Sequence, residues 1–273
     1  ERIAKIKRKI VKMSFRFCVL GSSSSGNCTL VQAAGTTILI DAGFSGKVIR
    51  EQLATIDIVP EQIDAVFITH EHSDHAKGIA GLAKYRNIQW FASRGTARHL
   101  ADKKVEWNIV VPAKSHAFPF KDLRVQAFSV PHDSQEAVGY IFECNGEKLA
   151  WMSDCGKPTI QCLENLKDVQ TLFLESNYDL QMLRNSDRPY DLKERIHSAH
   201  GHLSNEQCAQ FLNDLQNEVL QQIYFVHISR ECNELALVQN ACGNVLAQKW
   251  GDALRVEFVD PCAMMPANAR CGF

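Results

Sequence analysis

Four metal-binding side chains follow directly after a short apolar run, and this arrangement restricts what the chain can be. Residues 64–69, Asp-Ala-Val-Phe-Ile-Thr, predict a short buried strand because β-branched and aromatic residues dominate the run. The pattern H-x-H-x-D-H comes next, formed by His70, His72, Asp74 and His75. In an extended segment, side chains two residues apart project to the same side, so His70 and His72 can hold one ion. A polar loop with hydrogen-bonded histidines is the alternative.

A helix is predicted to begin within this motif. Its apolar positions are supplied by Ala76, Ile79, Ala80, Leu82 and Ala83. Asp74 and His75 then point from a second backbone direction toward a neighbouring position. Four ligands at a strand–loop–helix junction are what two adjacent divalent ions need, and the predicted context strengthens the motif.

The size and charge of the chain limit its class. Its 273 residues, 45% of them hydrophobic, suffice for one large domain or two small ones. Lys and Arg number 30 against 31 Asp and Glu, a formal net charge of −1. A strongly basic footprint for nucleic acid is therefore absent from the chain as a whole. Basic residues that line only a cleft stay compatible with a nucleic-acid enzyme.

The cysteines and the ends of the chain indicate a cytoplasmic protein. Ten scattered cysteines include no C-x-x-C pair, so a thiolate zinc site is not indicated and structural thiols are expected. No apolar run has transmembrane length, so no membrane partner is expected. Residues 1–12 are basic without a signal-peptide core and are interpreted as an N-terminal extension or helical appendage. The main domain is predicted over residues 13–260, with a loose tail over 261–273.

Other predicted strands also end in polar residues. Asp41, His132, Asp154 and His227 each come at or just after the end of an apolar run. One edge of the sheets would therefore gather them beside the H-x-H-x-D-H motif. Hairpins over 29–40 and 137–152, the latter with Asn145-Gly146 at its turn, require antiparallel pairing. A sandwich of two sheets flanked by helices fits better than a doubly wound parallel sheet.

The remaining elements are predicted as follows. Further strands are expected at 15–20, 88–92, 107–111, 123–130, 171–174, 222–226 and 254–258. Helices are expected at 47–56, 94–103, 205–219 and 233–250, with Ser204 as the N-cap of the third. Residues 184–201 are polar and are interpreted as a surface excursion.

The polar residues divide into two ligand sets. Imidazole and carboxylate groups suit zinc, and also manganese or iron. Two such ions form a clamp for hydrolysis when a carboxylate and a water bridge them, and the bridging water is then a hydroxide near neutral pH. We assign His70, His72 and His132 to one ion. Asp74, His75 and His227 are assigned to the other, with Asp154 as the bridge.

These motifs, in this order, resemble those of the metallo-β-lactamase-fold hydrolases. The resemblance is carried by Asp41-Ala-Gly43, His70-Glu-His72-Ser-Asp74-His75, Pro131-His132-Asp133, Asp154-Cys-Gly156 and His227, and extends from about residue 15 to 258. It implies a single-domain α+β protein, a four-layer αββα sandwich with a dinuclear metal site at the edge between the sheets.

Three stretches narrow the resemblance. Gly21-Ser-Ser-Ser-Ser-Gly-Asn27, His202-Leu-Ser-Asn-Glu206 and Val226-His-Ile-Ser-Arg-Glu-Cys-Asn233 resemble the YycJ/WalJ-type branch, which is regarded as related to DNA exonucleases. Glu175, His202 and His227 also parallel the ribonuclease Z group. Cleavage of a phosphodiester must protonate or stabilise a departing alkoxide. By resemblance, His202 is the candidate for that role and Glu175 orients it, whereas an ordinary loop histidine is the alternative.

Several further residues have two interpretations. Asp74 can be a ligand, a proton acceptor or both. Asp41 is expected to orient a ligating histidine, or to be a turn aspartate. Substrate contacts are predicted for Ser23, Ser24, Asn27 and Ser204, although the serine-rich stretch can equally be a tight turn; it lacks the Lys of a P-loop.

The other histidines and arginines are weaker candidates. His99, His116, His197 and His200 are interpreted as bystanders. The following arginines are candidates either for phosphate contacts or for a solvated surface: Arg184, Arg188, Arg195 and Arg230.

Three functions follow in order of preference. The first is a dinuclear metal-dependent phosphodiesterase or nuclease linked to repair, a 5′–3′ or single-strand exonuclease acting on DNA in preference to RNA. The second is a hydrolase of small phosphodiesters or thioesters on the same scaffold. The third is a non-hydrolytic metal- or redox-sensing protein, which the absence of a flavodoxin-like domain disfavours.

Overall fold

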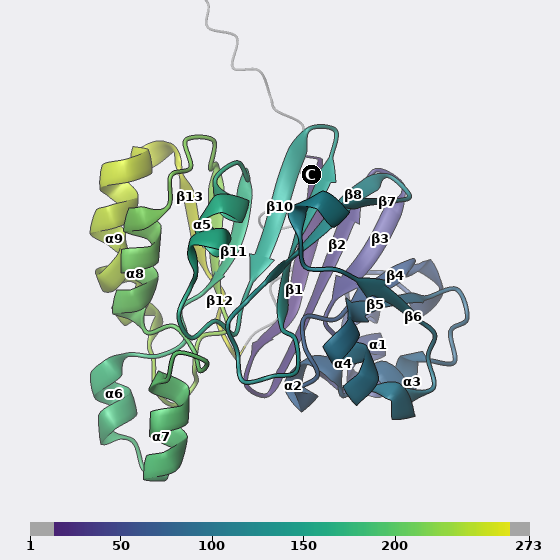
Figure 1. The fold of residues 1–273 in the computed structure, drawn as a ribbon, viewed down its shortest axis with the longest axis horizontal. Helices are drawn as coiled ribbons and strands as arrows, with labels where there is room; N and C mark the ends of the chain where they lie inside the picture. The colour runs from purple at the N-terminus through teal and green to yellow at the C-terminus, as the bar shows by residue number, and fades with distance from the viewer. Residues whose placement is uncertain (1–13, 263–273) are drawn as a thin grey trace, which may run out of the picture.

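Two β-sheets lie face to face, with helices on both outer faces (Figure 1). The computed structural model describes residues 14–262. The apolar run and the strands that end in polar residues therefore belong to a four-layer αββα sandwich, as predicted. The predicted N-terminal extension, residues 1–12, and most of the predicted tail lie outside the described residues.

The first sheet holds its strands in chain order. Strands β1, β2 and β3 pair antiparallel with one another in chain order. From β3 onward, β4, β5 and β6 are added in parallel pairing. Its strands are β1 Phe15–Ser23, β2 Gly26–Ala33, β3 Thr36–Ile40, β4 Ala65–Phe67, β5 Gln89–Ser93 and β6 Trp107–Val110.

The second sheet is mixed in the same way. Strands β7 to β10 pair antiparallel, and β10 to β13 pair parallel. Its strands are β7 Phe118–Phe120, β8 Leu123–Ser129, β9 Val138–Cys144, β10 Glu147–Met152, β11 Thr171–Glu175, β12 Gln222–Val226 and β13 Arg255–Phe258. The predicted Asn145-Gly146 turn joins β9 to β10, and both residues have positive φ, 51° and 81°.

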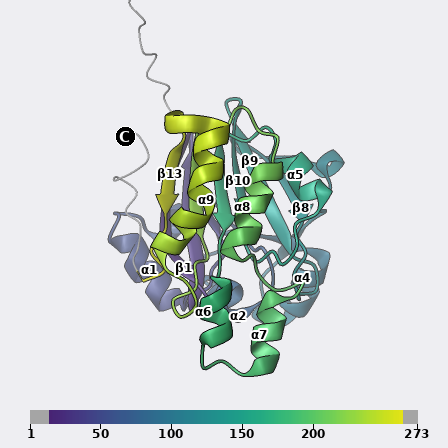
Figure 2. The same ribbon diagram turned by 90° about the vertical axis from the view of Figure 1, so that its left-hand side faces the viewer.

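The helices cover the outer faces and the metal-binding edge. On the first sheet lie α1 Gly46–Ala54, α2 Ser73–Ala76, α3 Ile79–Leu82 and α4 Arg94–His99. On the second lie α5 Ile160–Leu166, α8 Asn205–Asp214 and α9 Leu235–Trp250, the last two side by side in Figure 2. The hairpin of α6 Leu180–Asn185 and α7 Tyr190–His197 has a small apolar cluster of its own.

Aromatic side chains fill the space between the sheets. The ring of Phe17 on β1 meets those of Phe173 and Tyr224 on the opposite sheet edge-on, at centroid distances of 4.8 Å each. Phe67 on β4 likewise meets Phe142 on β9 at 5.1 Å. Edge-to-face pairs add to the burial of apolar area, so this layer fixes one sheet against the other. That rigidity holds the ends of the strands, and hence the site, in place.

Several predicted elements differ in detail. The serine-rich stretch is mostly strand, since Ser22 and Ser23 pair with Asn27 and Gly26 and leave only Ser24 and Ser25 in the turn. The predicted surface excursion over 184–201 is mostly exposed, and it contains the end of α6 and the whole of α7. The single helix expected after the motif is broken into α2 and α3. It breaks at Gly78, where an added Cβ would lie 2.5 Å from the Phe44 carbonyl oxygen.

Three residues at the ends of strands have left-handed backbone. Asp41 after β3, Asp154 after β10 and His227 after β12 have φ of 61°, 55° and 53°. This region costs a residue with a side chain roughly 1–2 kcal/mol. At these three positions an unfavourable backbone conformation is kept, and it sets the direction of the side chain.

The part of the chain that the structure describes has neither a membrane-spanning helix nor a disulfide. Within residues 14–262, no helix has the length and hydrophobicity needed to cross a bilayer. The cysteines in this range are free thiols, all buried except Cys262. They pack as small apolar residues, as expected from their scattered positions.

Candidate metal centre and active site

The ends of six strands, β3, β4, β8, β10, β11 and β12, meet at one edge of the sandwich and carry the predicted site. In Figure 1, α2 marks this edge, with α6 and α7 on its left and α3 and α4 on its right. All the predicted ligands fall into overlapping groups whose ligand atoms lie within 4.8 Å of one another: His70, His72, Asp74, His75, His132, Asp154 and His227.

The first group joins His70 and His72 to His132. His72 Nδ1 and His132 Nε2 are 3.2 Å apart, and His132 is oriented by its Nδ1 contact of 3.1 Å with the Gly201 carbonyl. Two nitrogens that bind one tetrahedral zinc at about 2.1 Å are about 3.4 Å apart. The separation of these rings therefore fits ligands of a single ion. The sequence assigned the same three residues to one ion.

The second group joins Asp74 and His75 to His227. Asp74 Oδ2 lies 3.5 Å from His75 Nε2 and 3.8 Å from His227 Nε2. All three come from different backbone directions: the start of α2, its interior and the end of β12. This is the second set that the sequence predicted.

Asp154 lies between the two groups. Its carboxylate is 3.3 Å from His75 Nε2, 3.6 Å from His227 Nε2 and 3.9 Å from His132 Nε2. Asp154 Oδ2, His70 Nε2 and His227 Nε2 are buried atoms without a hydrogen-bond partner. Buried polar atoms are almost always satisfied, so three orphans converging in one place indicate a missing ligand. Imidazole and carboxylate donors suit a divalent metal, and the residues fit one.

Asp41 is positioned to orient His75. Its Oδ2 is 2.8 Å from His75 Nδ1, which leaves Nε2 directed at the second group. Its Oδ1 accepts the backbone N–H of Thr69 at 2.8 Å. Burial raises the pKa of the Asp41 carboxyl, although the charge of His75 opposes that rise. This contact is what the predicted orienting role requires.

Glu175 connects His202 to His227. The same oxygen, Oε1, lies 2.8 Å from the Nδ1 atoms of both rings. Oε2 accepts the backbone N–H groups of Cys155 at 2.9 Å and Leu203 at 3.2 Å. Burial alone would raise the pKa of Glu175, but the two histidines outweigh it and hold that pKa below its ordinary value. With both oxygens occupied in these contacts, Glu175 is placed to orient the two histidines.

The carboxylates also set the charge of the two most buried ligands. Burial disfavours the imidazolium forms of His75 and His227. For both rings the charge of Asp154 leads the opposing effects, which raise the pKa of His75 well above its ordinary value and that of His227 to about 10. In the metal-free protein these two rings therefore carry protons.

His202 lies at the rim of this centre. Its ring centroid is 5.4 Å from that of His132 and 5.3 Å from that of His227. The side chain is 19% exposed. Its Nδ1 is held by Glu175, whereas within residues 14–262 its Nε2 makes no hydrogen bond. The free nitrogen is thus available to a bound molecule.

Three of the four residues predicted to contact substrate are buried and have partners within the protein. Ser23 and Asn27 are 1% and 0% exposed, and Asn27 Nδ2 instead lies 3.0 Å from both the Ser23 carbonyl and His75 Nε2. The Ser204 hydroxyl accepts the Gln207 N–H at 3.2 Å as the N-cap of α8. The side chains of Asn27 and Ser204 therefore make contacts within the protein. Ser24 is exposed in the turn, and its substrate contact stays a prediction.

Two supporting hydroxyls escaped sequence analysis. Ser22 Oγ accepts the backbone N–H of His227 at 2.8 Å and thereby fixes the last ligand. Thr69 Oγ1 lies 3.0 Å from both Asp41 oxygens and from His70 Nδ1. Thr69 could have been found as the residue before the motif. Nothing in the sequence links Ser22 to a residue 205 positions away.

Three of the four candidate arginines have partners within the protein. Arg195 is paired with Asp133, and Arg188 Nε with Glu231 at 2.9 Å. Arg230 donates to the Pro261 carbonyl at 2.9 Å. Their side chains are therefore at least partly committed to structural contacts.

The fold and the site define a metal-dependent hydrolase, and the chain belongs to the β-lactamase superfamily. The model of the "Beta-lactamase superfamily domain" matches residues 36–228, more than half of the chain. The predicted family and fold are thus confirmed.

Named relatives of similar sequence indicate a narrower group within this superfamily. Exodeoxyribonuclease YycJ of Bacillus anthracis is 31% identical over 91% of this chain and 97% of its own. Exodeoxyribonuclease WalJ of Streptococcus pneumoniae is 32% identical over 87% of this chain and 90% of its own. Ribonuclease Z of Aeropyrum pernix is 44% identical over 20% of this chain and 17% of its own. The predicted resemblance to the YycJ/WalJ-type branch and to ribonuclease Z is confirmed.

A solved structure agrees on the fold. The metallo-β-lactamase-fold protein YhfI of Bacillus subtilis superposes with a TM-score of 0.71 at 12% identity. The match covers 92% of this chain and 98% of that one. At this level of identity the likeness concerns the fold alone.

Proposed function

We propose that this protein is a dinuclear metal-dependent phosphodiesterase that degrades DNA as an exonuclease. The printed activity of its relatives YycJ and WalJ, matched over most of both chains, supports a DNA substrate. Zinc or manganese suits the donor set, with His70, His72 and His132 on one ion, Asp74, His75 and His227 on the other, and Asp154 between them. Free buried thiols fit a reducing compartment such as the cytoplasm.

The observation that carries the proposal is the pairing of His202 with Glu175 at 2.8 Å. A proton donor beside a metal centre is needed when the leaving group is an alkoxide. His202 presents its free Nε2 at the rim while Glu175 fixes the other nitrogen. Because the pKa of Glu175 is held low, the carboxylate stays ionised and stabilises the protonated ring.

The residues of the site have separate roles in the proposed hydrolysis. Bound divalent ions lower the pKa of coordinated water and act as Lewis acids toward the phosphate. Asp41 and Glu175 hold His75 and His227 in the orientation that ligation needs. His202 donates a proton from Nε2 to the departing oxygen, and Asp74 is positioned to accept one from the attacking water.

The test uses single- and double-stranded DNA labelled at either the 5′ or the 3′ end. Wild type and His202→Ala are each loaded with manganese or zinc, and metal content is measured alongside the rate. We expect wild type to shorten DNA from one end. His202→Ala should keep its metal and lose about 10²- to 10⁴-fold in kcat, the usual contribution of a general acid.

A control substrate and RNA complete the design. Bis(p-nitrophenyl) phosphate has a good leaving group that needs little protonation, so its hydrolysis should depend less on His202. If fully metallated wild type cleaves only this small ester and neither DNA nor RNA, the protein is a small-phosphodiester hydrolase and the nuclease proposal is rejected.

A further inference from the structure

A cavity of about 750 Å³ opens directly beside the metal centre on the side of α4. His72, a predicted ligand, and Asp133 form its inner end. Lys77, His99 and Lys103 line it farther out. The cavity therefore adjoins the metal centre through the side chain of His72.

A second cavity, of about 590 Å³, lies next to the first. The two share His99 and Gln135 in their walls, and together they are here called the α4 groove. The outer part adds Arg94 and Arg98 from α4, and three apolar residues of the β6 end: Ile109, Val111 and Pro112. Ile109 and Val111 are 42% and 44% exposed, unusual for side chains of their kind.

The acidic side chains of the groove are already engaged. Glu71 accepts the Gln135 N–H at 2.7 Å, and Glu136 accepts the Gly95 N–H at 2.7 Å. Asp133 is paired with Arg195, and Asp102 with Lys103 at 3.1 Å.

The cations of the groove are largely free. Throughout residues 14–262, no carboxylate pairs with Lys77, Arg94 or Arg98, and all three side chains are exposed. On the opposite side of α2, by contrast, Arg188 and Arg195 are held in ion pairs. Unpaired positive charge therefore lines the groove at the end of α2, with Lys77, and along α4, with Arg94 and Arg98.

We propose that the α4 groove binds a single strand of nucleic acid, holding it while its end lies at the metal centre. This rests on the proposed phosphodiesterase function and adds the path of the substrate. A single strand has a charged backbone and exposed apolar bases, which match the arginines and the exposed aliphatic residues of the groove. A duplex conceals its bases and offers nothing to Ile109 and Val111.

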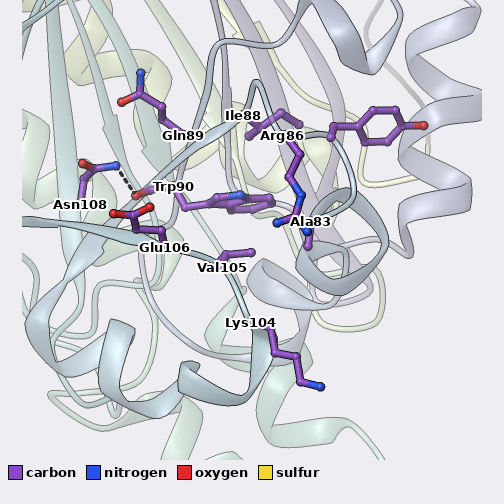
Figure 3. Close-up of a pocket in the computed structure, with 10 residues that line it drawn as sticks. Ala83, Arg86, Ile88, Gln89, Trp90, Lys104, Val105, Glu106 and Asn108 are labelled. Atoms are coloured by element: carbon purple, nitrogen blue, oxygen red, sulfur yellow. Dashed lines mark hydrogen bonds between the residues drawn. The ribbon is translucent and has the colours of Figure 1, made fainter.

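The test variant is Arg94→Gln/Arg98→Gln. Its matched control is Arg86→Gln/Lys104→Gln, which removes the same charge from a cavity of about 360 Å³ at the amino ends of β5 and β6. Figure 3 shows this cavity, where Asn108 donates to the Trp90 carbonyl at 3.2 Å. The metal motif follows the carboxyl end of the neighbouring β4, so the control lies at the opposite end of the sheet.

Binding of a fluorescent single-stranded 12-mer is measured by anisotropy in manganese-loaded protein that also carries His202→Ala. We expect the groove variant to raise Kd about tenfold in low salt, and to reduce the slope of log K against log salt by about 1.4, or 0.7 for each lost phosphate contact. Arg94→Lys/Arg98→Lys should keep most of the affinity. In the wild-type background, kcat/KM for bis(p-nitrophenyl) phosphate should stay within twofold, which also verifies that the variant folds.

The outcomes separate the two proposals. A groove variant that binds the strand as tightly as the control overturns the groove, whether or not the enzyme cuts DNA. If wild type cuts neither DNA nor RNA but binds the strand through Arg94 and Arg98, the phosphodiesterase proposal fails and the groove stands. If the protein binds no single strand at all, the groove is rejected, and the phosphodiesterase proposal is decided by whether wild type cuts DNA or RNA.

Discussion

Two buried carboxylates perform the same task on opposite sides of the metal centre. Asp41 holds Nδ1 of His75 and Glu175 holds Nδ1 of His227, each at 2.8 Å. In both cases the ring is left with Nε2 toward the ligand groups. Orienting partners of this kind fix the tautomer and raise the basicity of a ligating histidine.

This arrangement predicts that metal uptake releases protons. The pKa of His75 is raised and that of His227 reaches about 10, so both rings are protonated at pH 7 in the metal-free protein and must lose a proton to ligate. Calorimetry in buffers of different ionisation enthalpy should count about two protons released per chain. Since the rings lose these protons more readily as pH rises, apparent metal affinity should increase from pH 6 to pH 9.

His227→Ala supplies the control for this measurement. It removes one of the two titrating rings, and the count should fall by about one proton. Metal binding that releases no protons, with an affinity that does not change over this pH range, would contradict the predicted charge state.

The candidate ligands and the carboxylates Asp41 and Glu175 could be proposed from the sequence, but the supporting hydroxyls could not. H-x-H-x-D-H is a local pattern with a known chemical preference, and His132, Asp154 and His227 each mark the end of an apolar run. Ser22 contacts His227 across 205 positions, a relation that depends on the docking of two sheets. The burial of Ser23 and Asn27 could not be predicted for the same reason, because burial is a property of the assembled fold.

At the scale of elements, the site depends on how closely the β3–α1 connection approaches α2. A Cβ placed on Gly43 would lie 1.6 Å from the Asp74 carbonyl oxygen and 2.5 Å from the Asn27 nitrogen. Both neighbours are backbone atoms, so no side-chain rotation relieves the contact. Only a glycine permits this approach.

Gly43→Ala should therefore displace α2 and its ligands. We expect a loss of about 1–3 kcal/mol of unfolding free energy, as for overpacking in general, together with weaker metal binding. Urea denaturation and metal analysis measure the two effects. Gly243→Ala is the matched control, since nothing beyond the neighbouring backbone of α9 lies within 4 Å of the added Cβ and alanine should stabilise the helix by about 0.5–1 kcal/mol. Equal stability of the two variants would show that α2 adjusts freely.

Periodic and apolar elements were predicted well, whereas short or polar ones were not. The hairpins and the strands that end in ligands have clear apolar runs. Strand β7, Phe118–Phe120, is only three residues long and contains a proline, which argues against a strand. Helices α6 and α7 are mostly polar because they pack on only a few residues, including Leu183 and Ile196. Because these helices bury few side chains, the sequence shows little apolar periodicity in them.

At the scale of the molecule, the metal centre connects the two sheets. His70, His72, Asp74 and His75 follow β4 of the first sheet, whereas His132, Asp154 and His227 follow strands of the second. Each predicted ion draws ligands from both. Metal binding therefore reinforces the same contact that the aromatic layer makes between the sheets.

Removing the metal should lower the stability of the whole molecule. A ligand present at about 100 times its Kd stabilises the folded state by about 2.7 kcal/mol. For a chain of this size, chelation should then reduce Tm by roughly 5–11 °C. Calorimetry with and without chelator measures the change, and His75→Ala should show a smaller one. A Tm that chelation leaves unaltered would mean that metal does not join the sheets.

The division of the ligands between the sheets also bears on the order in which the chain is synthesised. Domains begin to fold from the amino terminus while translation continues. A nascent chain that already contains the H-x-H-x-D-H motif still lacks His132, Asp154 and His227, and so holds neither complete ligand group. A product truncated by premature termination before residue 132 would thus hold neither complete ligand group, and we expect it to have no hydrolytic activity.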